Sequence, residues 1–158
     1  MKKVTSVYEA MNGLRRLRHD ESRINKLKSY DSFALRTLLQ GNFDPRVKFD
    51  FPKGEPPYEK KNEKVELVKP IVKRLGRCLA NAPGTKVGKE RMFIDFLEII
   101  NRRDAALFVL MKDRALQTKY PFLTEEIVRA AFPTLLPPKK DDSPSQDDSQ
   151  STETDQTE

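Results

Sequence analysis

The side chains that most often build catalytic or metal sites are scarce in this sequence. His19 is the single histidine, Cys78 is the single cysteine, and there is no tryptophan. His19 lies in the polar stretch Leu17–Glu21, where no companion nucleophile is marked, so we expect a solvated side chain and not a general base. Zinc sites draw mainly on cysteine and histidine, so no zinc site is expected. The sequence predicts a non-enzymatic protein without a cofactor or metal.

Two further patterns could suggest a ligand site. The segment Ala82–Lys89 has the glycines, threonine and lysines of a phosphate-binding loop. It lacks the required spacing, in which two glycines bracket four residues and are followed directly by Lys and Ser or Thr. We therefore interpret it as a turn between helices whose exposed amides could still meet anions. Asp95 and Glu98 could bind magnesium, but they are explained more simply as the polar side of an apolar helix.

Positive charge is the strongest chemical signal. Residues 141–158 contain seven acidic and no basic side chains, so residues 1–140 carry 30 basic and 17 acidic ones, a formal net charge of +13. Such a charge attracts phosphate backbones and acidic proteins, and the acidic end of the chain can compete for the same surface. We predict nucleic-acid binding by a first cluster of Arg15, Arg16, Arg18, Arg23, Lys26 and Lys28, and by a second cluster of Lys69, Lys73, Arg74 and Arg77.

The second cluster has helical spacing. If both clusters meet on one exposed side, they would neutralise several phosphates and give sequence-tolerant, strongly salt-dependent binding. No base-reading motif is visible, so no base specificity is inferred. Three alternatives stay open: an acidic surface of transcription or replication machinery as partner, a minor structural role in a virion, or basic residues that only alternate with acids on solvated helix faces.

Helices are predicted to position these basic residues. Residues 4–18 carry apolar side chains at steps of three and four, which is typical of an amphipathic helix, and a second short helix follows with Ile24 and Leu27. A third helix is predicted to begin with Asp31 as N-cap, to bury Phe33 with other apolar residues, and to end at Gly41.

An irregular segment is expected next. Val47, Phe49 and Phe51 alternate with charged residues, as in a short strand or an extended segment with one buried face. A proline-rich extended loop at residues 46–58 includes Pro56–Tyr58, which could be a ligand for a proline-recognition domain. We expect instead that Tyr58 packs over the protein's own core.

The second half of the chain predicts further helices. One begins at Pro70 and contains Cys78, which is expected to be a buried and inert thiol. The most apolar helix covers residues 92–100, and Asn101 both ends it and caps its successor. A last helix begins after the N-cap Thr124.

The predicted organisation is a small all-α domain of five to seven helices with one extended proline-rich loop. It comprises a basic N-terminal helical segment (1–30), a helical core domain (31–138) and a disordered acidic tail (139–158). Neither a signal peptide nor a stretch of about 20 apolar residues is visible, so we expect a soluble protein without a membrane partner.

Four stretches, at residues 33–49, 51–58, 91–113 and 123–136, occur in a characteristic order. Together they resemble an uncharacterised family of small proteins from T4-like tailed bacteriophages, including phages of marine cyanobacteria, over roughly residues 31–136. The resemblance implies a helical domain with an extended proline loop, in an auxiliary phage protein of the infected bacterial cytoplasm. It implies no activity and no functional residue.

Overall fold

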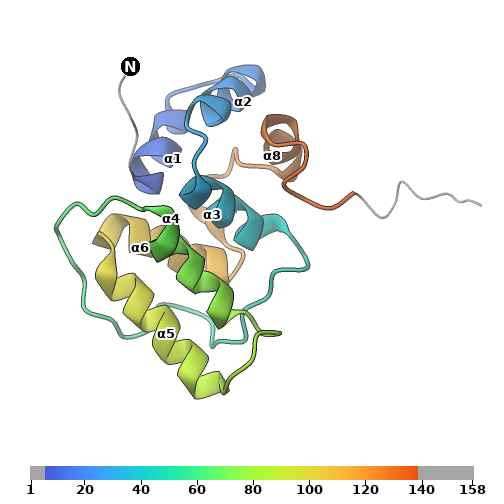
Figure 1. The fold of residues 1–158 in the computed structure, drawn as a ribbon. Coiled ribbons are helices and arrows are strands. Elements are labelled where there is room, and N and C mark those ends of the chain that lie inside the picture. Colours follow the sequence, from blue (N-terminus) through green and yellow to red (C-terminus); the bar gives the residue numbers. More distant parts are fainter. Residues whose placement is uncertain (1–5, 139–158) are drawn as a thin grey trace, which may run out of the picture.

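The fold is built from helices, as predicted (Figure 1). A computed structural model describes residues 6–138, so the predicted tail at 139–158 lies outside the described residues. Within residues 6–138 there are eight α-helices and one 3₁₀-helix, more than the five to seven predicted, because α4 and α7 are single turns. The elements are α1 (Val7–Arg15), α2 (Asp20–Ser29), α3 (Phe33–Phe43), α4 (Lys69–Val72), the 3₁₀-helix η1 (Lys73–Cys78), α5 (Lys86–Ile99), α6 (Arg102–Lys112), α7 (Leu116–Lys119) and α8 (Glu125–Ala131).

Helix α3 occupies the centre of the arrangement, in contact with α1, α4 and α6 (Figure 1). On one side of it α2 packs against α1 and α8, and on the other η1 packs against α5. Leu35, Leu38 and Leu39 of α3 are completely buried. Gly41 was predicted to end this helix, which is wrong: Gly41 lies inside α3, where a Cβ atom would collide with the thioether of Met111 in α6. This glycine therefore allows a close approach between two helices.

The N-terminal helices share the core of the rest of the protein. Val7, Met11 and Leu14 of α1 and Leu27 of α2 are buried in the same apolar cluster as α3. Ser6 caps α1 by accepting from the amide of Glu9. The amphipathic pattern predicted for residues 4–18 thus forms the shorter helix Val7–Arg15, and residues 6–30 are packed onto the domain predicted for residues 31–138.

Local capping signals decide where several helices begin. Asn101 accepts from the amide of Arg103 and Thr124 accepts from that of Ile127, which confirms both predicted caps. The predicted cap at Asp31 is wrong, because Ser32 accepts from the amide of Leu35. Asp31 instead accepts two hydrogen bonds from the guanidinium of Arg36, at 2.6 and 2.9 Å. Those bonds lower the pKa of Asp31.

The 3₁₀ geometry of η1 separates its apolar and charged side chains. Pro70 lies in the first turn of α4, as predicted, and η1 continues α4 directly. A 3₁₀-helix has three residues per turn, so Val72, Leu75 and Cys78 lie in one row and are buried. Burial raises the pKa of Cys78 to about 11, as expected for an unreactive thiol. The other rows expose Lys73, Arg74 and Arg77.

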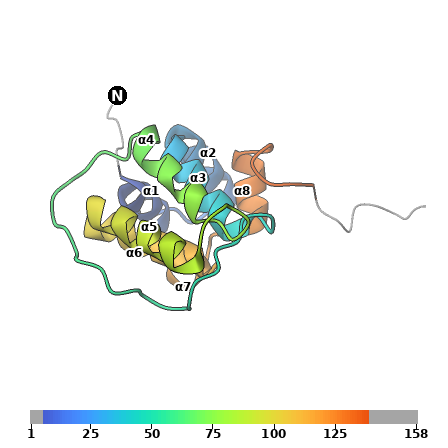
Figure 2. The ribbon, with the colours of Figure 1, turned by 60° about the horizontal axis from the view of Figure 1, so that its bottom comes forward.

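The irregular segment 44–68 runs along the outside of the helices (Figure 2). It forms no strand, and its one β-bridge joins Lys61 to Asn101. Phe49 and Phe51 are half-buried against Phe93 of α5, with ring centroids 6.1 and 5.3 Å away. The predicted alternation therefore produces an extended segment with aromatic anchors and not a sheet. Tyr58 is also half-buried over the core, as expected.

Arg114 fixes the turn that follows α3. Its guanidinium donates to the backbone carbonyls of Asn42, Asp44 and Val47. Arg114 itself has a positive φ of 57°, which is uncommon for a residue with a side chain. The buried carboxylate of Asp44 accepts from the amide and guanidinium of Arg46, so the same turn is also held from within. The start of the extended segment is thereby tied to the end of α6.

We predict that Arg114→Ala lowers the free energy of unfolding by about 2–4 kcal/mol, because three carbonyls lose a charged donor. Arg77→Ala is the control, since Arg77 is exposed, and its effect should stay within about 0.5 kcal/mol. Urea unfolding of the full chain measures both. Equal stability of the two variants would show that Arg114 does not organise the turn.

Candidate nucleic-acid interface

The ten predicted binding residues are accessible but do not form one surface. Nine of them are exposed and Arg23 is half-buried. Within residues 6–138, Arg23 is also the only one of the ten in an ion pair, with Asp20 at 3.0 Å. The other nine form no ion pair within the described residues, and the alternative that they are only solvated charges on helix faces stays open.

The first cluster divides into residues with different roles. Arg15 donates to the carbonyl of Lys119, with its guanidinium 4.9 Å from the ring centroid of Tyr120. Arg23 donates to the carbonyl of Leu17, and its guanidinium lies 4.7 Å from the ring centroid of Phe122. These two arginines hold the N-terminal helices against the segment between α7 and α8.

The other members of the first cluster point in several directions. Arg16 is the C-cap of α1 and Arg18 lies in the connection between α1 and α2, whereas Lys26 lies in the last turn of α2. Lys28 is displaced from Lys26 by about 200° around the helix, at about 100° per residue. Lys26 places its ammonium 5.4 Å from the ring centroid of Tyr30. Of this cluster, Lys26 is thus the residue whose ammonium lies at the aromatic ring between α2 and α3.

The second cluster stays together. Lys73, Arg74 and Arg77 line a groove of about 340 Å³ that also touches Met92 and Asp95 of α5. Asp95 is the acid nearest to these cations in the groove, and it forms a 3.7 Å ion pair with Arg91. At the start of α4, Lys69 places its ammonium 5.2 Å from the ring centroid of Phe33.

Aromatic rings connect Lys26 to the second cluster. Tyr30, Phe33 and Lys69 line one cavity of about 190 Å³, and Phe33 and Lys73 line a neighbouring apolar groove of about 280 Å³ between α3 and η1. These shared walls make a continuous surface from the end of α2 across the start of α3 to η1. We call it the aromatic–basic strip: Lys26, Tyr30, Phe33, Lys69, Lys73, Arg74 and Arg77.

Sequence reasoning missed the two aromatic members of the strip. Phe33 was predicted to be core, but it is 40% exposed, because it is the first residue of α3 and lies at the edge of the packed face. Tyr30, at the end of α2, is half-buried. The signal that could have found them is an aromatic residue at a helix end beside a lysine cluster.

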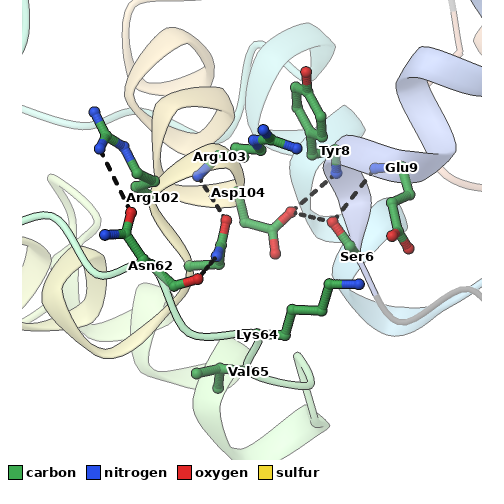
Figure 3. Close-up of a pocket in the computed structure, with 10 residues that line it drawn as sticks. Ser6, Tyr8, Glu9, Asn62, Lys64, Val65, Arg102, Arg103 and Asp104 are labelled. Atoms are coloured by element: carbon green, nitrogen blue, oxygen red, sulfur yellow. Dashed lines mark hydrogen bonds between the residues drawn. The ribbon is translucent and has the colours of Figure 1, made fainter.

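A cavity of about 640 Å³ lies at the start of α1, apart from the strip (Figure 3). Asp104 of α6 forms its wall, and one carboxylate oxygen accepts from the Ser6 hydroxyl at 2.7 Å and from the Tyr8 amide at 2.9 Å. Asp104 is 1% exposed, and burial raises its pKa despite these hydrogen bonds. The contacts join the start of α1 to the start of α6.

The chemistry of this cavity is that of a structural joint. The Ser6 hydroxyl donates to Asp104 and accepts from the Glu9 amide at 3.3 Å. Both hydrogen bonds hold the start of α1 in place. No histidine or lysine contacts it as an activating base within the described residues. Across residues 6–138, no three His, Cys, Asp or Glu side chains gather where they could hold a metal ion.

The glycine segment before α5 forms the expected turn. Thr85 caps α5 by accepting from the amide of Gly88, and Gly84 adopts a φ of 121°. Lys86 pairs with Asp50 at 3.7 Å, and Lys89 is buried with its ammonium donating to the carbonyl of Ala80. Both lysines are thus held by other parts of the protein. No helix of residues 6–138 has the length and apolar content to cross a bilayer.

Together these features define a small all-α protein with an exposed strip of cations and aromatic rings. The model of a family of unknown function (DUF6433) matches residues 11–118, which is more than half of the chain, and the protein belongs to this family. The matched residues include both basic clusters. No curated protein and no solved structure matches the chain.

We predict that the free energy of unfolding of the Asp104→Asn variant increases, relative to that of the native protein, as pH rises from about 4 to 7. The folded-state pKa of Asp104 is raised, so its contribution to stability is present below the unfolded value and is lost as pH rises through the folded value. Asparagine keeps an acceptor for Ser6 and Tyr8 without the buried charge. Urea unfolding at several pH values measures the difference.

Asp31→Asn supplies a comparison of opposite sign. Arg36 lowers the pKa of Asp31 below 3.8, so the stability that Asp31 contributes is present above that value and is lost as pH falls through the lower folded value. This variant should therefore lose stability relative to the native protein as pH rises from about 2 to 4, and its relative stability should change little from about 4 to 7. Parallel curves for the two variants would contradict the assignment of Asp104 as a buried, destabilised carboxylate.

Proposed function

We propose that the protein binds nucleic acid through the aromatic–basic strip, without sequence specificity and without catalysis. The observation that carries this proposal is the grouping of Lys69, Lys73, Arg74 and Arg77, which are exposed and form no ion pair within residues 6–138, beside an exposed aromatic ring. The setting we propose is the cytoplasm of a phage-infected bacterium, where the protein acts as an auxiliary phage factor.

The charges of the strip set the expected salt dependence. Each cation that neutralises a phosphate releases condensed counterions, so log K falls with log salt with a slope of about −0.9 per contact on a duplex and about −0.7 on a single strand. Four contacts give a slope of about −3 to −4. Affinity should therefore fall by about 50- to 150-fold between 50 and 200 mM salt.

An acidic protein surface, such as that of transcription or replication machinery, is the second candidate. The same exposed cations favour it, because they would pair with carboxylates as well as with phosphates. An acidic protein surface gives the exposed ring of Phe33 no role in binding, and we rank this candidate second for that reason. A minor virion component ranks third. Affinity capture after nuclease treatment distinguishes a protein partner, which survives the treatment, from a nucleic-acid bridge.

We predict that Lys73→Glu combined with Arg77→Glu weakens binding of a labelled 20-nucleotide strand by at least about tenfold at 50 mM salt, with a salt slope smaller in magnitude by about 1.4 or more. The two lost phosphate contacts cause both effects. Fluorescence anisotropy at several salt concentrations measures them with the full chain and with both single-stranded and duplex probes.

Lys53→Glu combined with Lys61→Glu is the matched control, since both lysines are exposed, lie in the segment 44–68 and give the same change in net charge. Its binding should stay close to that of the native protein. An equal loss of affinity in both double variants would show that net charge, and not the strip, attracts the probe. Absence of salt-sensitive binding by the native protein to either probe would refute the proposed function.

A further inference from the structure

We propose that the strip takes single-stranded nucleic acid, with one unpaired base stacked on the ring of Phe33 and the adjoining phosphates along Lys69, Lys73, Arg74 and Arg77. This inference rests on the proposed function and adds to it the class of nucleic acid and the residue that contacts the base. An aromatic platform beside a cationic track is the usual way in which proteins hold single strands without reading their sequence.

Phe33 is distinguished from the other aromatic residues by its exposure. Three large apolar side chains of residues 6–138 are exposed, namely Phe33 (40%), Val68 (41%) and Val87 (78%), and Phe33 is the one aromatic among them. Phe33 and Val68 both adjoin Lys69, which directly follows Val68 and lies over the Phe33 ring. The strip therefore brings together exposed apolar surface and a cation that forms no ion pair among residues 6–138.

A nucleic-acid base can displace the Lys69 ammonium from the face of the Phe33 ring. It lies 5.2 Å from the ring centroid and forms no ion pair within the described residues. A lysine side chain is flexible, so its ammonium can move to a phosphate while a base takes the ring face, and both groups keep a favourable partner. The interaction seen without ligand thus marks the face that a base would use.

The apolar groove beside Phe33 extends the platform. Phe33 and Lys73 both line this groove of about 280 Å³, whose other walls include Val47, Phe49 and Met111. An apolar floor next to a cation suits a nucleotide, which has an aromatic base and a charged phosphate. The groove between η1 and α5, with Arg74 and Arg77, continues the cationic track beyond Lys73.

A duplex fits this surface less well than a single strand. Stacking requires a free base face, and in a duplex those faces are covered by neighbouring base pairs. The elements of the strip are packed onto α3 and α5 rather than presented as a free helix that could enter a groove. Single strands therefore gain the aromatic contact, whereas duplexes gain the phosphate contacts alone.

Phe33→Leu should weaken binding of a 12-nucleotide thymidine strand by about tenfold, within the range measured for loss of one base–aromatic stack. Its binding to a duplex should be unchanged, and its salt slope should match that of the native protein, because no phosphate contact is lost. Phe33→Tyr should retain affinity. A uridine strand of equal length tests whether RNA is bound in the same way.

A direct readout of stacking is available because the chain has no tryptophan. Phe33→Trp introduces a single indole in the strip, and its fluorescence should be quenched when the thymidine strand binds. Val87→Trp is the matched control, since Val87 is exposed at the start of α5, outside the strip. Its fluorescence should not change.

The outcomes separate the two proposals. If the native protein binds strands and duplexes equally, or if Phe33→Leu weakens both alike, or if Phe33→Trp is not quenched while binding persists, the stacking inference is overturned and the proposed function stands. If the native protein binds neither probe, both proposals fail.

Discussion

The contact between α3 and α6 is the interaction on which the rest of the structure depends. Gly41 allows the two helices to approach, and Arg114 ties the turn after α3 to the end of α6. Buried Asn42 strengthens the same junction, because its side chain accepts from the amide of Leu116 and donates to Gln117. With α3 fixed in this way, the helices on its two sides are placed relative to each other, and so are the two ends of the aromatic–basic strip.

The strip also depends on the geometry of one short helix. From the last residue of α4 through η1, a three-residue repeat buries Val72, Leu75 and Cys78 and exposes the charged residues between them. The apolar row docks η1 onto α5, and the same docking holds the cations on the outside of the helix. Stability and the proposed binding therefore use different residues of one element, so the charged residues can be exchanged without loss of core packing.

Local signals in the sequence predicted much of the fold, whereas features that depend on contacts between distant residues could not be predicted. Asn101 and Thr124 cap helices that need no tertiary partner to be recognised. Aspartate and serine both commonly cap helices, so the sequence did not distinguish Asp31 from Ser32. Arg36 pairs with Asp31, and Ser32 caps α3. Gly41 ends no helix because Met111, 70 positions away, requires its small size. The basic clusters were found by composition, but the division of the first cluster and the exposure of Phe33 depend on how helices pack, which spacing alone does not show.

The single thiol of the protein gives η1 a built-in reporter. Cys78 is completely buried in the row that faces the core, and its Sγ contacts the carbonyl of Arg74 one turn earlier. A labelling reagent can reach this sulfur only when η1 separates from its neighbours, so the modification rate follows the frequency of that local opening. Any molecule that bridges η1 and α3 from the outside would slow the reaction. The modification rate of Cys78 thus reports how firmly η1, with its exposed cations, is held on the protein.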